Sequence, residues 1–193
     1  GRAFSDLADA LLARTLDAVS AEFERKHGRI AGGKVAILGM GKLGSRELTA
    51  GSDIDLILLY EHGAEEESDG ERPLGPAQYY ARFTQRLIAA ISAPTAEGVL
   101  YEVDLRLRPS GNKGPVATRF SSFSKYQHAE AWTWEHMALS RARVVAGDAE
   151  FGEVIASEIA AILALPRDRA KVAKDVREMR ILIEEEKPSK SVW

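Results

Sequence analysis

The feature that most constrains the fold of this chain is a strand-like run with two carboxylates at its head. Residues 54–60, IDLILLY, are apolar on both faces apart from Asp55, a pattern typical of a strand buried inside a sheet. Side chains two apart in a strand point the same way, with Cα atoms about 6.6 to 6.8 Å apart, so Asp53 and Asp55 share a face. Neighbouring buried carboxylates repel, which indicates either a raised pKa or a bound cation.

A second acidic segment is expected to lie beside this strand. Residues 98–108, GVLYEVDLRLR, alternate strictly, which predicts a strand with Asp104, Arg106 and Arg108 on one face. Three carboxylates suit two Mg²⁺ ions roughly 3.5 to 4 Å apart, and arginines on the same face suit triphosphate oxygens. The alternative is that both arginines only pair with acidic neighbours on an exposed sheet face. The predicted catalytic and metal-binding residues are Asp53, Asp55 and Asp104.

The connection before the carboxylate pair is rich in glycine. Gly44 and Ser45 would let backbone N–H groups and a hydroxyl approach phosphates, with Lys42 nearby as a cation or simply as a solvated lysine. The hexapeptide GMGKLG also matches the dinucleotide fingerprint G-x-G-x-x-G. Only eight residues separate Gly44 from Asp53, whereas a normal crossover needs at least about ten to twelve. We therefore favour a phosphate-binding turn and predict nucleotide contacts from Lys42, Gly44, Ser45, Arg106 and Arg108.

The remaining periodicity predicts an α/β (α+β) fold, with a small mixed sheet flanked by helices and a helical C-terminal part. Ser5 is available to cap the first helix. The aromatic residues of segment 119–146 are expected in the core rather than as a platform for adenine: Phe123, Tyr126, Trp132 and Trp134. We predict three segments: an N-terminal helix (1–30), a catalytic core (31–118) and a helical segment (119–193) truncated at its C-terminal end. Helices are expected at about 4–23, 76–92, twice within 119–146, at 151–164 and at 168–186, and a further strand at 34–39.

Composition excludes several classes of function. A net charge of −3 gives no overall basic surface, which argues against nucleic-acid binding. The absence of cysteine removes disulfides and thiolate sites and fits a reducing cytoplasm. No apolar run is long enough to cross a bilayer, and no signal segment opens the chain. We therefore expect a cytoplasmic protein that binds neither nucleic acid nor membrane.

These motifs resemble a known family. A glycine-serine turn, a D-x-D strand and a later aspartate form the pattern of the nucleotidyltransferase superfamily, which has the polymerase-beta-like fold. More closely, the chain is similar to the adenylyltransferase domain of bacterial glutamine synthetase adenylyltransferase, and AWTWEHMAL resembles its C-terminal, adenylylating half. Family members often carry a second glycine where this chain has Ser45. The tracts that carry the resemblance are GMGKLGSRELTAGSDIDLILLY, YEVDLRLRPSGNKGP, YQHAEAWTWEHMALSRARVVAGD and DVREMR.

The resemblance implies transfer of AMP from ATP to a tyrosine hydroxyl of glutamine synthetase, in control of nitrogen assimilation. Asp53 and Asp55 would ligate two Mg²⁺ ions, or Mn²⁺, and Asp104 would complete the site nearest the attacking oxygen. Gly44 and Ser45 would hold the β and γ phosphates. The family also implies a PII-type signalling partner for the full-length enzyme. The alternatives are the deadenylylating, phosphorolytic sister activity and a non-catalytic module that senses nucleotide.

Overall fold

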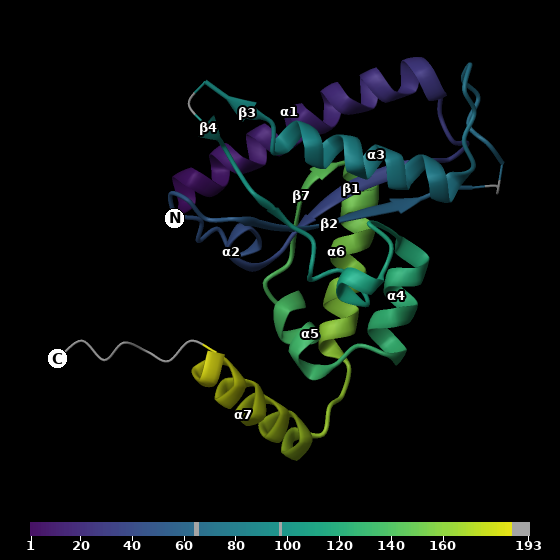
Figure 1. Cartoon of the computed structure of the whole chain (residues 1–193). Coiled ribbons are helices and arrows are strands. Elements are labelled where there is room, and N and C mark those ends of the chain that lie inside the picture. The colour runs from purple at the N-terminus through teal and green to yellow at the C-terminus, as the bar shows by residue number, and fades with distance from the viewer. Residues whose placement is uncertain (64–65, 97, 187–193) are drawn as a thin grey trace.

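The computed structural model describes residues 1–63, 66–96 and 98–186 of the 193. Its helices are α1 (Arg2–His27), α2 (Gly41–Gly44), α3 (Pro76–Ile91), α4 (Phe120–Ala129), α5 (Thr133–Leu139), α6 (Ala149–Ala164) and α7 (Arg169–Glu186), with a 3-10 turn at Gly111–Lys113. Its strands are β1 (Lys34–Gly39), β2 (Ile54–Glu61), β3 (Pro94–Thr95), β4 (Gly98–Val99), β5 (Val103–Asp104), β6 (Ala117–Arg119) and β7 (Arg143–Gly147). None of the described helices is long and apolar enough to span a membrane. The predicted mixed α/β architecture is confirmed (Figure 1).

The main sheet has the order β5-β2-β1-β7, and β6 also pairs with β2. β1 runs antiparallel to both β2 and β7, whereas β5 and β6 run parallel to β2. The sheet is therefore mixed, as predicted. Because β1 and β2 are antiparallel and only the four-residue α2 begins their connection, this is not the parallel β-α-β unit of a dinucleotide site.

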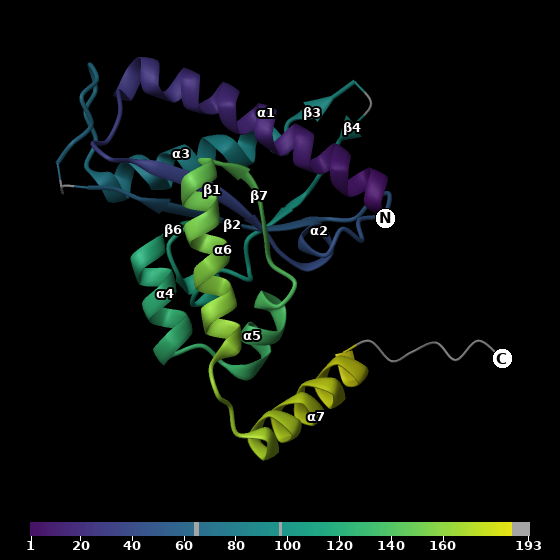
Figure 2. The ribbon, with the colours of Figure 1, turned by 180° about the vertical axis from the view of Figure 1, so that it is seen from behind.

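Two helical layers cover the sheet, one on each face. Figures 1 and 2 show α1 and α3 on one side and α4, α5 and α6 on the other. Side chains of β2 point alternately to the two faces of the sheet. Leu56 and Leu58 pack with α1 and α3, whereas Ile57 and Leu59 pack beneath α4 and α6. All four side chains are at most 2% exposed. The prediction that this strand is buried on both faces is confirmed.

Two predictions of secondary structure were wrong. Segment 98–108 is not one strand, because β4 pairs only with β3 in a hairpin and the chain turns after Asp104. The tract expected to be two helices does contain α4 and α5, but it ends in β7, which pairs with β1. A short apolar run such as RVVAG does not reveal by periodicity whether it is a helix or a strand. The division into segments 1–30, 31–118 and 119–193 stays a prediction.

Two predictions about side chains were also wrong. Ser5 lies inside α1, whose N-cap is Gly1, and its buried hydroxyl donates to the Gly1 carbonyl at 3.2 Å and accepts the Leu48 N–H at 3.3 Å. Of the aromatic residues in segment 119–146, Phe123 is fully buried, but Trp132 is 71% exposed at the start of α5. Helical spacing indicates one face of a helix without showing whether a neighbour covers it.

Candidate functional site

The three predicted carboxylates meet at one end of the sheet. Asp55 is the second residue of β2, Asp104 is the second residue of β5, and the two are register partners in a parallel pair. Asp53 directly precedes β2, where the Ile54 N–H donates to the Glu102 carbonyl at 2.9 Å. Register partners on adjacent strands point to the same face about 4.7 to 4.9 Å apart. The backbone therefore brings together residues that lie about fifty positions apart in the sequence.

The pKa values of Asp55 and Asp104 are shifted in opposite directions. The pKa of the Asp55 carboxyl is raised, first by burial and then by the charges of Asp104 and Asp53. The pKa of the Asp104 carboxyl is lowered, first by its hydrogen bonds with the Arg106 side chain. Opposite shifts of the pKa in two neighbouring carboxyls are an imbalance typical of functional sites.

Arg106 is hydrogen-bonded to Asp104 through both its side chain and its backbone. Its Nε and Nη2 donate to Oδ2 of Asp104 at 2.7 and 2.5 Å, and its backbone N–H donates to Oδ1 at 2.8 Å. The guanidinium itself is 74% exposed. With Asp104 turned toward Arg106, no group of three or more His, Cys, Asp or Glu side chains in the described part of the chain is arranged to hold a metal ion.

Arg108 borders the same hollow as Asp104 and Arg106, but as a buried rather than an exposed side chain. The Arg108 side chain is buried, with Nη1 donating to the Leu105 carbonyl at 2.7 Å and Nε donating to the Pro115 carbonyl at 3.0 Å. It therefore closes the turn after Asp104, although its charge still lowers the pKa of that carboxyl. Its contact with a nucleotide stays a prediction.

The glycine turn, which we define as residues 41–45, packs directly against Asp55. Gly41 has φ +50°, and a Cβ there would lie 2.4 Å from Oδ2 of Asp55. A Cβ on Gly44 would lie 1.9 Å from the Arg141 carbonyl oxygen. The Met40 N–H donates to the Asp55 carbonyl at 2.8 Å. Glycine is needed here because the backbone runs too close to its neighbours for any side chain.

The other residues of the glycine turn differ in their surroundings. The Ser45 hydroxyl lies 3.0 Å from the Gly41 carbonyl and 2.8 Å from the Glu47 carboxylate, and its single proton can be donated to either. It also accepts a hydrogen bond from Nη2 of Arg141 at 2.8 Å, and Arg141 pairs with Glu47. Lys42 is exposed. The predicted phosphate-binding hydroxyl is therefore already held within a small polar cluster.

Sequence reasoning missed two arginines of the site, Arg141 and Arg143. The charge of Arg141 lowers the pKa of Asp55, and Nη2 of Arg143 donates to the Leu43 carbonyl in the glycine turn at 3.1 Å. Both were assigned to a helix, because the short apolar run that follows them does not reveal by periodicity whether it is a helix or a strand. Arg143 opens β7, and Arg141 lies in the turn directly before it, so this segment brings both arginines to the glycine turn.

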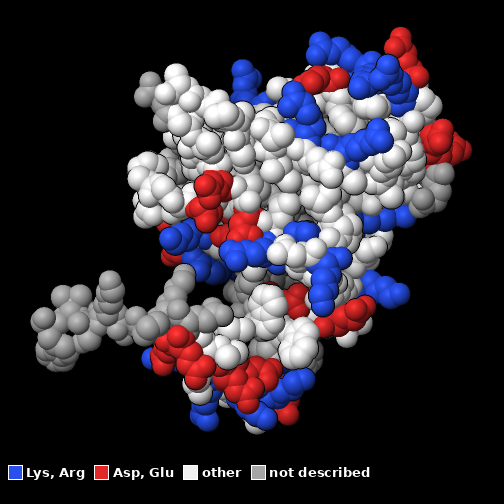
Figure 3. Space-filling model, in the orientation of Figure 1, with Lys and Arg blue, Asp and Glu red and all other residues white. Residues whose placement is uncertain are grey.

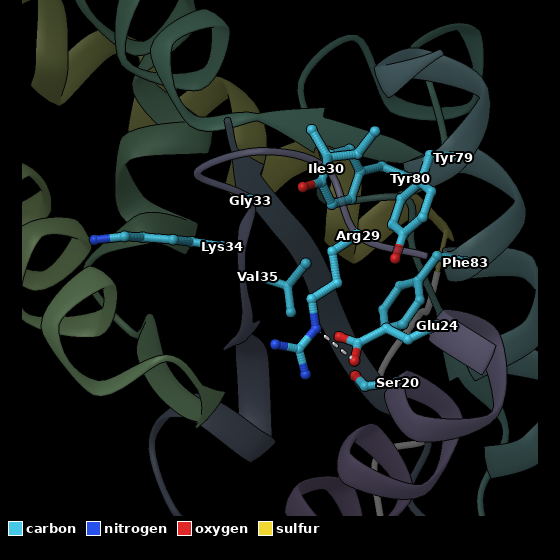
Figure 4. A pocket seen from close by; sticks show the side chains of 10 residues that line it. All are labelled: Ser20, Glu24, Arg29, Ile30, Gly33, Lys34, Val35, Tyr79, Tyr80 and Phe83. Atoms are coloured by element: carbon cyan, nitrogen blue, oxygen red, sulfur yellow. Dashed lines mark hydrogen bonds and ion pairs between the residues drawn. The ribbon is translucent and has the colours of Figure 1, made fainter. Parts of the chain in front are cut away.

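Among the hollows formed by the described residues, two lie at opposite ends of the sheet. One, of about 510 Å³, is lined by Asp53, Glu102, Val103, Asp104, Leu105, Arg106, Arg108 and Asn112. The other, of about 190 Å³, lies between α1, α3 and the start of β1, where the Glu24–Arg29 ion pair spans 2.8 Å (Figure 4). No predicted site residue lines this second hollow, so the first is the candidate site. The face in Figure 3 carries acidic and basic side chains in small mixed groups.

Arg106→Gln is expected to raise the pKa of Asp104 toward its usual value, because Arg106 is the main group that lowers it. The same change should raise the pKa of Asp55 further, since the Arg106 charge lowers that pKa as well. Carboxyl ¹³C chemical shifts followed against pH measure both. Arg86→Gln, far from the carboxylates, is the matched control. Unchanged titration of Asp104 in Arg106→Gln would contradict the site as described.

Comparison with known proteins gives a consistent result. Residues 1–158 match the family described as "Glutamate-ammonia ligase adenylyltransferase". The chain is similar over its whole length to proteins named "Bifunctional glutamine synthetase adenylyltransferase/adenylyl-removing enzyme", with 65% identity for Mesorhizobium japonicum, 66% for Brucella suis and 63% for Rhizobium meliloti. It spans about a fifth, 20%, of the length of each of these relatives.

Proposed function

The chain belongs to the glutamate-ammonia ligase adenylyltransferase family, and from this membership we propose that it transfers AMP from ATP to a tyrosine hydroxyl of glutamine synthetase. The observation that carries the proposal is the pairing of Asp55 with Asp104 at the sheet end where the glycine turn packs. Asp53, Asp55 and Asp104 are the proposed catalytic residues. The names of the relatives, which include adenylyl transfer to glutamine synthetase, support the choice of substrate.

The donor set fits Mg²⁺ or Mn²⁺ by its chemistry, because carboxylate oxygens are the ligands that these cations prefer. We propose that Asp53 and Asp55 hold two ions and that Asp104 joins the one nearest the attacking oxygen. Burial and, after it, the charges of Asp104 and Asp53 raise the pKa of Asp55, and a cation would relieve the repulsion between these charges. Bound Mg²⁺ would supply charge neutralisation at the phosphates and at the leaving pyrophosphate.

The Arg106–Asp104 ion pair suggests how the proton of the tyrosine is handled. A tyrosine hydroxyl with pKa near 10 is mostly protonated at neutral pH, so Asp104 is proposed to accept its proton. While Arg106 is hydrogen-bonded to Asp104, the pKa of the Asp104 carboxyl is lowered, and the carboxylate is therefore a weak base. Movement of the exposed guanidinium onto the triphosphate would release Asp104 and neutralise the phosphates in one step.

The glycine turn is proposed to hold the β and γ phosphates through Gly44 and Ser45. Backbone N–H groups in such turns bind anions, and the absence of Cβ atoms allows close approach. Lys42, exposed beside the turn, is proposed to neutralise phosphate charge, with Arg108 in a supporting role near Asp104.

We propose the adenylylating direction and the adenylylating half of the enzyme, supported by the tract at residues 131–139. The second candidate is phosphorolysis of adenylyl-tyrosine by the same carboxylates, because the relatives are also named adenylyl-removing enzymes. Added inorganic phosphate separates the two directions. For the whole polypeptide we propose a cytoplasmic location and a PII-type signalling protein as regulator, with neither nucleic acid nor membrane as partner.

Mg²⁺ with ATP is expected to raise the melting midpoint of the wild-type chain, because a ligand of the native state stabilises it by about 2.7 kcal/mol at a hundred times its Kd. Mg²⁺ with NAD should leave the midpoint unchanged, since the fold lacks a dinucleotide crossover. The shift with Mg-ATP should vanish in Asp55→Asn. A shift with NAD but not with ATP would contradict the proposed site.

A further inference from the structure

We infer that Arg143, oriented by Asp9 of α1, is a positioning residue that fixes the glycine turn for the nucleotide. The inference rests on the proposed function, because it assigns a support to the proposed phosphate-binding turn. In Figures 1 and 2 the N-terminal half of α1 lies beside α2, although the chain places β1 between them. The residues that join the two are far apart in sequence: Arg143 lies 134 positions from Asp9.

The Arg143 guanidinium binds the glycine turn and α1 at the same time. Its Nε donates to the Gly44 carbonyl at 3.2 Å and its Nη2 donates to the Leu43 carbonyl at 3.1 Å. Its Nη1 and Nη2 donate to Oδ2 and Oδ1 of Asp9 at 2.8 and 3.0 Å. Carbonyls at the end of a helix lack full intrahelical pairing, and α2 has only four residues. The Leu43 carbonyl accepts the Arg46 N–H at 3.3 Å, and Arg143 adds donors to it and to the Gly44 carbonyl.

The glycine turn has close neighbours on its other sides. Gly44 lies against the Arg141 carbonyl and Gly41 against the Asp55 carboxylate, both closer than a Cβ would allow. A shift of the turn would therefore move the backbone beside Asp55. Arg143 thus fixes the position of the proposed phosphate-binding turn relative to the carboxylates. In this role it contacts neither the nucleotide nor the metal ions.

The geometry requires both an arginine and a carboxylate. Only a planar guanidinium can bind a carboxylate with two parallel hydrogen bonds and still direct N–H groups to two carbonyls. The side chains of Arg143 and Asp9 are 24% and 19% exposed, so the pair is more shielded than the surface pair of Arg86 and Glu22, at 47% and 49%. Glu22→Gln removes a comparable contact of α1 away from the glycine turn and is the matched control.

The test uses the 193-residue chain with Arg143→Lys, Asp9→Asn and Glu22→Gln. Three measurements are made on each: the affinity for Mg-ATP by calorimetry, the steady-state rate of AMP transfer, and amide hydrogen exchange at Ser45 and Glu47. Those two amides donate within the turn, to the carbonyls of Gly41 and Lys42. For Arg143→Lys and Asp9→Asn we expect about tenfold weaker affinity, about tenfold faster exchange and kcat at saturating ATP within about threefold of wild type. Glu22→Gln should match wild type in every measurement.

Two results would overturn the inference. One is wild-type exchange at Ser45 and Glu47 in Arg143→Lys, and the other is a loss of affinity equal in all three variants, which would show only general destabilisation. If the wild type binds no Mg-ATP, the proposed function fails, while the exchange measurement still decides whether Arg143 fixes the turn. Should Arg143→Lys fail to fold, Asp9→Asn, which keeps the shape of the side chain, carries the same comparison.

Discussion

Asp55→Asn is expected to reduce AMP transfer by about a thousandfold or more while leaving the fold intact. Asparagine keeps the size of the side chain but removes the negative charge beside Asp53 and Asp104 on which cation binding depends. Losses of this size follow removal of a group that acts in the reaction itself. Initial rates with α-labelled ATP, at saturating ATP and Mg²⁺, measure the change, and Asp17→Asn on the exposed face of α1 is the matched control.

The same variant should be at least as stable as wild type when Mg²⁺ is chelated near pH 7. Because burial and two neighbouring charges raise the pKa of Asp55, the folded state binds its proton more tightly than the unfolded state does. The charged carboxylate therefore lowers stability above its folded pKa, and this cost disappears as the pH falls below the usual aspartate value. Wild type and Asp55→Asn should converge in acid. Strong destabilisation of Asp55→Asn in chelator would make Asp55 a structural partner instead.

Gly44→Ala is expected to lower the free energy of unfolding by about 3 kcal/mol or more and to abolish nucleotide binding. The added Cβ would lie 1.9 Å from the Arg141 carbonyl oxygen and 2.7 Å from the Gly39 carbonyl oxygen. Both contacts are with backbone, so neither can be relieved by rotation of a side chain. For a chain of this size, each kcal/mol corresponds to roughly 2 to 4 °C in the midpoint.

Gly51→Ala separates this clash from the general cost of replacing glycine. Gly51 has φ +72°, and a Cβ added there would have nothing within 4 Å, so alanine should cost only about 1 to 2 kcal/mol of left-handed strain. Denaturant titrations of both variants give the comparison. Equal destabilisation of the two would mean that Gly44 does not pack against the Arg141 and Gly39 carbonyls as described.

The part of the site that could be predicted from the sequence is the part encoded by short patterns. An apolar run with a D-x-D head identified β2 as a buried strand, and both of its faces are covered. A second acidic strand was expected beside it, and Asp104 is the register partner of Asp55. Both expectations needed only the alternation of side chains along a strand, which is a local property.

The rest depended on contacts between distant segments. β7 is a five-residue strand whose identity comes from pairing with β1, so neither its Arg143 nor Arg141 in the turn before it could be placed at the glycine turn in advance. The alternating segment 98–108 stops being a strand after Asp104, because the Arg108 side chain folds back onto carbonyls of the following turn. Trp132 has the spacing of a core residue, yet no described neighbour covers it.

The most direct test of the central claim is label transfer from α-labelled ATP to glutamine synthetase by the wild-type chain with Mg²⁺. We predict label on a tyrosine of glutamine synthetase, one pyrophosphate released for each label, and no transfer by Asp55→Asn. Phosphate-dependent release of label from adenylylated glutamine synthetase, without forward transfer, would contradict the proposed direction. Absence of both reactions, in a chain that is folded and binds Mg-ATP, would contradict the claim that these carboxylates catalyse AMP transfer.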